Sequence, residues 1–446
     1  MKRCARTQSL ILSLTVAAGF SACSTPDAAP PGSGDPLGTV AEPLDYHRDA
    51  KALLDRYCTD CHQAGGIAPF ALTGYAAAKA QASQMKAAIV GGSMPPWMPA
   101  DSGVPLLHSR KLRPEDRASL LAWIDQGAPE GDPQAASRVV LPPADKVEPP
   151  RPDVVADMGL TYQPNPKVTD DYRCFVIDPN LTADRYLRAV DVRPGNRRLV
   201  HHVILFEIPL AAAAKVRSKD AAEDGPGYTC FGGAGSNSAQ MVAGWAPGGV
   251  PGRLRDDEGI LLRKGSLLVM QVHYNNRQND GQGDRTVATL ELLADKPAHQ
   301  LILLPVARPD QLMIKAGDPN AQQLIAVPVS LIMSYAQIGG TELVLSGTTP
   351  HMHTLGKRVV TSVNDSPLVE IPRWDFHWQQ AYQFQNPVSL RPTDTLVVEC
   401  DYDNSFANQP VVDGQKQMPR DVTWGEGTSD EMCISFLHVR MPTPAP

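Results

Sequence analysis

From about residue 156 onward, the chain consists of short β-branched runs, and this pattern most strongly limits what it can fold into. Runs such as HHVILFEI, SLLVMQVHYN, ELVLSGTTPHMHTLG and DTLVVECDYD are bounded by Gly, Pro, Asn and Asp. Such runs predict strands joined by turns. Nearly 300 residues follow this pattern, enough for two sandwiches. We therefore expect two all-β, jelly-roll-like domains, at 156–297 and 298–446.

Residues 45–132 have a helical pattern instead. RPEDRASLLAWIDQG opens with Pro114 and acidic residues and stops at Gly127, as expected for the two ends of a helix. Its predicted buried residues are Leu120, Leu121 and Ile124. We expect a small all-α domain here, followed by a Pro-rich linker at 133–155.

Composition excludes one class of partner. The chain has 446 residues, 42% of them hydrophobic and 20% charged, which is typical of a globular protein. Its formal net charge is -7 and its pI is about 5.9. No basic stripe is present, so we expect no nucleic-acid partner.

The N-terminus predicts export. Basic residues precede the apolar run SLILSLTVAAGFSA, which indicates a signal peptide at 1–22. FSAC resembles a bacterial lipobox, although Phe20 stands in the usual Leu position, and ordinary signal cleavage nearby is the alternative. We expect lipidation of Cys23, a flexible tether over 23–44 and a periplasmic location on the outer membrane. The membrane would then be contacted through the lipid anchor alone.

The helical region contains YCTDCHQ at 57–63, a CxxCH pattern typical of c-type haem attachment. Cys58 and Cys61 would bond the haem covalently, and His62 would be the proximal iron ligand. Spacing of i, i+3 and i+4 would place all three on one helix face. A disulfide or a redox CxxC are the other interpretations, and zinc would need a second Cys/His pair, which is absent before Cys174.

A haem of this kind needs a sixth ligand later in the same domain. GGSMPPWMPA offers Met94 and Met98, and His108 is a weaker candidate. This stretch resembles the MPPW loop of small class-I-like cytochrome c domains. We therefore predict a cytochrome c-like domain with Met94 as the axial ligand.

Histidines cluster at three places in the β region. LVHHVILFEI contains His201 and His202, QVHYN contains His273, and TPHMHTLG contains His351 and His353. Residues i and i+2 of a strand share a face, so an HxH pair can start a metal site, although two exposed histidines would give the same short pattern. The adjacent His201 and His202 could bind one ion together only at a β-bulge or a strand end.

These motifs, in this order and with Met432 in SDEMC, resemble the copper type II ascorbate-dependent monooxygenases, the family of peptidylglycine α-hydroxylating monooxygenase and dopamine β-monooxygenase. The stretches DDYRCF, GWAPGG and QVHYN add to the resemblance, which covers residues 158–440. It implies two copper ions. The electron-transfer copper would be bound by His201, His202 and His273. The oxygen-activating copper would be bound by His351, His353 and Met432, whose soft thioether suits Cu(I).

The resemblance also concerns the cysteines. It implies a disulfide between Cys400 and Cys433, which leaves Cys174 and Cys230 for the first β-domain. By the residues alone, four cysteines in an oxidising compartment allow three pairings.

Three positions depart from the amidating enzyme of the family. Its Arg two residues before HxH is Thr349 here, and its Asn and Tyr after the Met ligand are Ile434 and Phe436. Without a polar clamp for a carboxylate, we expect a small, neutral, more apolar organic substrate.

The implied activity is hydroxylation of a C–H bond: substrate-H + O2 + 2 e⁻ + 2 H⁺ → substrate-OH + H2O. The haem would supply or relay the electrons, with ascorbate or another redox protein as external one-electron donor. The alternative is a non-catalytic electron-transfer or copper-handling lipoprotein, which would bind no organic substrate. Five other histidines are expected to pack in the core or lie at the surface, with His377 a possible neighbour of the site: His47, His108, His299, His377 and His438.

Overall fold

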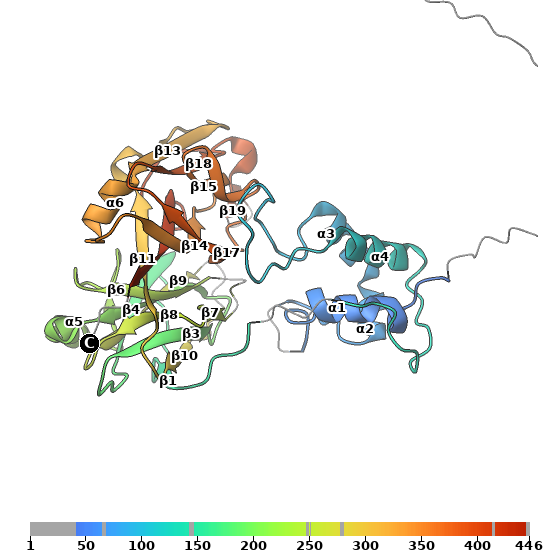
Figure 1. Cartoon of the computed structure of the whole chain (residues 1–446), viewed down its shortest axis with the longest axis horizontal. Coiled ribbons are helices and arrows are strands. Elements are labelled where there is room, and N and C mark those ends of the chain that lie inside the picture. The colour runs from blue at the N-terminus through green and yellow to red at the C-terminus, as the bar shows by residue number, and fades with distance from the viewer. Residues whose placement is uncertain are drawn as a thin grey trace, which may run out of the picture. The chain divides into compact units, whose positions relative to one another are not determined.

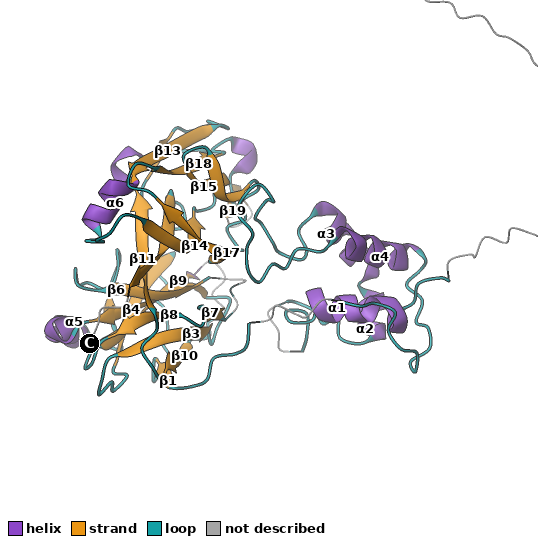
Figure 2. Cartoon of the chain, viewed as in Figure 1, coloured by secondary structure: helices purple, strands orange, loops and turns teal. Residues whose placement is uncertain are grey.

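The N-terminal part of the described chain is helical, and the rest consists mostly of strands with a few helical segments between them (Figure 2). The computed structural model describes residues 42–64, 68–141, 147–246, 249, 251–276, 281–412 and 415–442. The predicted signal peptide at 1–22 and the lipidation site Cys23 lie outside the described residues. Leu44–Pro446 form one compact unit. Within the described part, no helix has the length and apolar character needed to cross a membrane.

The helical region packs around one small core. Its elements are a π-helical turn η1 (Tyr46–Ala50), α1 (Lys51–Tyr57), α2 (Tyr75–Ala80), α3 (Ala82–Gly91) and α4 (Pro114–Asp125). Pro114 starts α4, as predicted, because its fixed φ suits the first helical position. The buried face of α4 differs from the prediction: Leu120 and Trp123 are fully buried, while Leu121 and Ile124 are half-buried. The larger indole fills the centre of the core.

The first sandwich contains the green to yellow strands of Figure 1. They are β1 (Val154–Asp157), β2 (Asp170–Ile177), β3 (Arg185–Arg193), β4 (Val200–Ile208), β5 (Tyr228–Thr229), β6 (Gln240–Trp245), β7 (Gly252–Arg253), β8 (Glu258–Leu262), β9 (Leu267–Asn275) and β10 (Val287–Leu293). One sheet has the order β5-β2-β9-β4-β6. Helix α5 (Leu210–Ala221) covers its outer face, so the central strand β9 is buried on both faces and lacks apolar–polar alternation.

The second sandwich follows in orange and red (Figure 1). Its strands are β11 (His299–Ala307), β12 (Met313–Ile314), β13 (Ala321–Pro328), β14 (Leu343–His351), β15 (Gly356–Val363), β16 (Ser366–Ile371), β17 (Tyr382–Leu390), β18 (Thr395–Tyr402), β19 (Val411–Val412), β20 (Gln415–Lys416), β21 (Val422–Thr423) and β22 (Ile434–Pro442). Helix α6 (Val329–Tyr335) and the 3-10 turns η3 (Pro309–Gln311) and η4 (Phe406–Asn408) complete it. A four-stranded sheet, β13-β18-β15-β16, packs on the β11-β22-β14-β17 strands.

One sheet runs through both sandwiches. Its order is β1-β10-β3-β8-β11-β22-β14-β17, with β7 also paired to β3. The join is the short parallel pairing of β8 with β11, in which Glu258 lies opposite His299. Because backbone hydrogen bonds cross the join, the two sandwiches hold a defined relative position, and with it the side chains that each contributes to a shared site.

The loop between α3 and α4 is attached to the second sandwich. Ala100 donates its N–H to the carbonyl of Glu370 on β16, at 2.8 Å. Residues 105–107 extend the β17 edge, where Leu106 pairs with Phe384. Trp97 and Met98 pack on the core of the second sandwich. The MPPW segment is therefore shared between the helical region and the β region.

Candidate functional site

Three histidines converge on one point in the first sandwich. His201 and His202 lie on β4 and His273 lies on the neighbouring strand β9. The Nδ1 atom of His201 is 3.2 Å from Nδ1 of His202 and 3.1 Å from Nδ1 of His273. The pairing of β4 with β9 shifts register between Val200 and His202. This β-bulge, one of the two local geometries that the adjacent histidines allow, turns both side chains towards the same point.

Within this three-histidine set (His201, His202 and His273), the surroundings keep His201 and His202 neutral. Burial, and then the nearby His273, hold the pKa of His201 and that of His202 well below their usual value. Neutral imidazoles are the form that binds metal ions. Ligand nitrogens from all three residues lie within 4.8 Å of one another. Gathered lone pairs in this arrangement fit a metal ion, and the imidazole chemistry suits copper.

Asp170 orients the third member of the set. Nε2 of His273 donates to Oδ1 of Asp170 at 2.9 Å, which leaves Nδ1 of His273 free to face the other two rings. Thr428, from the second sandwich, donates to the same carboxylate oxygen at 2.7 Å. The ring of Tyr172 stacks on His273, with centroids 4.1 Å apart and planes 11° from parallel. Asp170 thus holds one edge of the His273 ring, and Tyr172 packs against one face of it.

A second pair of histidines ends strand β14. The rings of His351 and His353 lie 5.1 Å apart. Nδ1 of His351 hydrogen-bonds to Oε1 of Gln379, and Nδ1 of His353 donates to the carbonyl of Asp430 at 3.0 Å. Burial lowers the pKa of His351 to about 4 and that of His353 to about 3. Both rings are neutral at pH 7, and their Nε2 atoms remain available as ligands.

Met432 is held next to this pair. Ile434 lies opposite His351 in the antiparallel pairing of β14 with β22, so continuing that register places Met432 opposite His353. The carboxylate of Glu431 accepts the N–H groups of His353 at 2.9 Å and of Met432 at 3.3 Å. Burial raises the pKa of Glu431 to about 8. One acidic side chain therefore ties the backbone of two predicted ligands together.

Both predicted disulfides are confirmed. Cys400 pairs with Cys433, whose neighbour is Met432, and Cys174 pairs with Cys230. Their Cα–Cα distances are 5.9 Å and 5.8 Å respectively. The first bridge joins β18 to the segment that carries Met432, so it restrains that segment.

One phenylalanine touches both sets of histidines. The Phe376 ring stacks on His201, at 4.7 Å between centroids and 27° between planes. It also meets the His353 ring edge-on at 5.9 Å. Phe376 is 9% exposed. The two sets therefore face one another across a single aromatic ring.

The positions that depart from the amidating enzyme form an uncharged group. Thr349 lies opposite Phe436 in the β14–β22 pairing, and Ile434 is buried. The Thr349 hydroxyl hydrogen-bonds to Nε2 of His438 at 2.9 Å. Among the described side chains named here, none is a lysine or arginine that could clamp a carboxylate.

The CxxCH residues follow a helix rather than lying on it, which corrects the prediction. Helix α1 ends at Tyr57, and Cys58 begins a single turn closed by the bond from His62 N to Cys58 O, at 2.9 Å. Nδ1 of His62 donates to the carbonyl of Phe70 at 3.1 Å, which leaves Nε2 free for iron. Cys58 and Cys61 are not bonded to each other. Burial raises the pKa of the Cys58 thiol to about 12, the opposite of what a reactive redox thiolate needs.

Met94, the predicted axial ligand, and Met98, the other candidate, have different surroundings. Met98 accepts the N–H of Asp375 on its sulfur, at 3.3 Å, and packs on the second sandwich. That contact engages Met98 in the β region. Met94 is half-buried just after α3 and makes no such contact among the described residues. His108 has a positive φ of 55° in the loop that leads to α4.

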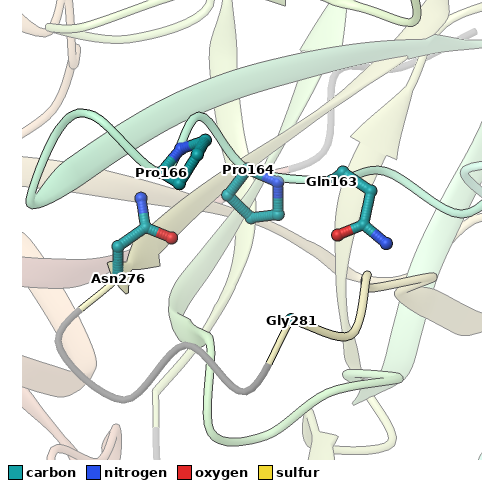
Figure 3. Close-up of a pocket in the computed structure, with 5 residues that line it drawn as sticks. All are labelled: Gln163, Pro164, Pro166, Asn276 and Gly281. Carbon is teal, nitrogen blue, oxygen red and sulfur yellow. The ribbon is translucent and has the colours of Figure 1, made fainter.

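Two pockets lie outside the histidine sets. One, of about 410 Å³, is lined by Gln163, Pro164, Pro166, Asn276 and Gly281, and has no charged side chain (Figure 3). The other, of about 790 Å³, has Trp97, Met98, Trp374 and Phe376 in its wall. Through Phe376, the second pocket borders the histidine sets.

Sequence reasoning missed several neighbours of the site. Asp170 lies in DDYRCF, and Phe376 and Gln379 lie in WDFHWQQ, where only His377 drew notice. His377 is exposed and pairs with Asp375 instead. The available signal is that these residues lie in two stretches that the sequence analysis had already singled out. Only the fold shows which side chains of those stretches contact a predicted ligand.

Residues 332–443 match the family model of the copper type II ascorbate-dependent monooxygenase C-terminal domain. DBH-like monooxygenase protein 2 of Mus musculus is 23% identical over 63% of this chain and 42% of its own length. Dopamine beta-hydroxylase of Canis lupus familiaris is 23% identical over 55% of this chain and 39% of its own length. Tyramine beta-hydroxylase of Caenorhabditis briggsae is 23% identical over 64% of this chain and 46% of its own length. The chain thus spans less than half the length of these three relatives, and the similarity supports the copper type II monooxygenase family for the β region.

Proposed function

We propose that this chain, whose C-terminal domain matches the copper type II ascorbate-dependent monooxygenases, is a copper-dependent monooxygenase that hydroxylates a C–H bond of a small, neutral organic substrate. The observation that carries the proposal is the facing arrangement of two histidine sets across Phe376. A structural metal site would need one set. Two sets with different donor atoms could hold two metal ions. If each ion delivers one electron, the pair serves a reaction that needs two.

The three-histidine set would hold the electron-transfer copper through Nδ1 atoms, and Asp170 would fix the third ring. His351, His353 and Met432 would hold the other copper, the histidines through Nε2. When bound, the copper ions supply the one-electron and O2 chemistry, and the mixed imidazole–thioether set favours Cu(I). The neutral, hydrogen-bonded rings supply ligand lone pairs without releasing protons, since burial keeps them unprotonated.

The substrate would meet an apolar wall. Ile434 and Phe436 replace the polar groups that the amidating enzyme uses, and Thr349 is bonded to His438. A charged carboxylate brought here would lose its hydration without finding a cationic partner, which is costly. A neutral substrate would bury apolar surface instead.

A c-type haem on Cys58, Cys61 and His62 would supply or relay the electrons, with Met94 as the sixth ligand. Supporting this, His62 already donates its Nδ1 proton to a backbone carbonyl, which fixes the ring with Nε2 free. Ascorbate or another redox protein would be the external donor. Export to the periplasm and lipidation at Cys23 complete the proposal.

The decisive experiment is metal and haem stoichiometry followed by isotope labelling. The exported chain with Cys23→Ser would be saturated with copper, and copper and covalent haem would be measured per chain. Two coppers and one haem are expected, with one copper lost in His351→Ala. Candidate neutral substrates would then be incubated under ¹⁸O2 with ascorbate, and a hydroxylated product would contain one ¹⁸O atom. If covalent haem were found without stoichiometric copper, the monooxygenase proposal would be rejected, and the chain would be an electron carrier.

A further inference from the structure

The larger of the two pockets lies between the loop that follows α3 and the second sandwich. Three of its lining residues are Trp97, Trp374 and Trp378, so we call it the tryptophan pocket. Residues 91–93 and 96–98 form one side, and most of the other side comes from 372–378. Its volume is about 790 Å³. Sites for small molecules typically measure about 300–1,000 Å³, so the pocket can enclose an organic molecule of drug-like size.

Hydrogen bonds hold the two sides of the tryptophan pocket together. The Arg373 guanidinium donates through Nη1 to the carbonyl of Gly91 at 3.2 Å and through Nη2 to that of Gly92 at 2.9 Å. At the other end of the loop segment, the sulfur of Met98 accepts the N–H of Asp375 at 3.3 Å. Because the segment is tied to the second sandwich at both ends, the pocket is built into the fold.

The wall of the tryptophan pocket is apolar inside and charged at its rim. Trp374 and Phe376 are 7% and 9% exposed, and Trp97, Met98 and Trp378 are half-buried. The titratable residues of the lining are all exposed: Arg373, Asp375 and His377. Burying apolar surface against such a wall is favourable, whereas a charged ligand would lose its hydration there. The pocket therefore suits a neutral, mostly apolar ligand.

Two wall residues connect the tryptophan pocket to the histidine sets. Nε1 of Trp374 donates to the carbonyl of His353 at 3.1 Å. The Phe376 ring meets the ring of His353 edge-on and stacks on that of His201. A ligand in this pocket would thus lie against residues that contact both sets.

The predicted haem ligands do not belong to this wall. Among the described residues that line it, none is Cys58, Cys61, His62 or Met94. Its occupant is therefore a molecule other than the haem.

We propose that the tryptophan pocket binds the organic substrate, a neutral, mostly apolar molecule of drug-like size, and that Trp97 and Trp378 determine which substrate fits. This inference rests on the proposed function and names its substrate site. Trp97 lies outside residues 332–443, which match the family domain, whereas Trp378 lies within them. Substrate choice thus depends on a wall that the helical region and the second sandwich build together.

The test is the binding of N-phenyl-1-naphthylamine, a neutral apolar probe whose fluorescence rises in apolar surroundings. The whole exported chain with Cys23→Ser would be titrated without added copper, and saturable binding at one site is expected. Trp378→Ala removes an indole from the wall, so it should raise the dissociation constant of the probe about 10-fold. Trp97→Leu, which keeps an apolar side chain against the second sandwich, should raise it in the same direction. The matched control is Tyr335→Ala, which removes a ring that is 80% exposed on α6 and should leave the dissociation constant unchanged.

A second measurement separates this inference from the proposed function. A substrate hydroxylated under ¹⁸O2 should displace the probe, and Trp378→Ala should raise its KM more than it lowers kcat. Equal dissociation constants in the unmodified chain and in folded Trp378→Ala and Trp97→Leu, or a hydroxylated substrate that leaves the probe bound, would overturn the inference alone. A chain without stoichiometric copper would overturn the proposed function and the substrate role of the pocket together, even if the probe still binds.

Discussion

Removing the Asp170 carboxylate should weaken copper binding at the three-histidine set and nowhere else. Asp170 accepts the Nε2 proton of His273 at 2.9 Å and the Thr428 hydroxyl at 2.7 Å. Without it, His273 can rotate or change tautomer, so that Nδ1 no longer faces His201. Losing such a partner of a metal-binding histidine typically costs about 10- to 100-fold in metal affinity. That corresponds to roughly 1.4–2.7 kcal/mol, the range of one hydrogen bond to a charged group.

Competition titration with a chromophoric Cu(I) chelator measures this directly. Asp170→Ala should lower the affinity of one copper by about 10- to 100-fold while the second copper keeps its affinity. Asp170→Asn keeps an acceptor oxygen, so its copper affinity at this set should lie between that of the unmodified protein and that of Asp170→Ala. Asp171→Asn is the matched control, because Asp171 bonds Tyr162 and Asn165 and touches no predicted ligand. Equal weakening of both coppers in a folded Asp170→Ala protein, or none at all, would refute the reasoning.

Three further perturbations test other parts of the site. Replacing Cys400 and Cys433 together by alanine should lower the free energy of unfolding by roughly 3–4 kcal/mol, because the disulfide closes a separation of 33 residues. Urea denaturation measures this free energy, and an unchanged urea midpoint would show that the disulfide does not stabilise the fold. Burial lowers the pKa of His438 to about 4, below the unfolded value, so its stabilising contribution is complete above pH 6.5 and is lost as pH falls towards 4. Thermal melts of the apo protein should therefore lose less stability between pH 6.5 and 4 in His438→Gln, and parallel curves would count against this. Gln379→Ala should lower the copper affinity of the His351 and His353 set by about 10-fold, since Gln379 holds the His351 ring. Gln322→Ala, on the exposed face of β13, serves as the control. Equal copper affinities in the two variants would reject a positioning role for Gln379.

Local patterns predicted the class of each region and the types of its ligands. The β-branched runs indicated strands because branched side chains suit an extended backbone, and Pro114 marked a helix start because its φ is fixed. The adjacency of His201 and His202 predicted a β-bulge or a strand end, since neighbours within a regular strand point to opposite sides. These are properties of a few consecutive residues. A single sequence contains them in full.

Contacts between distant residues depended on the fold. That His273 on β9 meets His201 is set by the order of the five-stranded sheet. The roles of Asp170 and Phe376 likewise depend on which loops meet, and no local pattern distinguishes them from other acidic or aromatic residues. The CxxCH turn was misplaced on a helix because residue spacing does not show where α1 ends.

The sequence by itself determined what chemistry the side chains can do: thiols and an imidazole spaced for a haem, imidazoles and a thioether suited to copper, and cysteines for two bridges. Tertiary structure decided how these groups combine. It placed two histidine sets on either side of Phe376 and packed Met98 against the second sandwich. The physical reason is that donor types are fixed residue by residue, whereas convergence depends on strand order and register across more than two hundred residues.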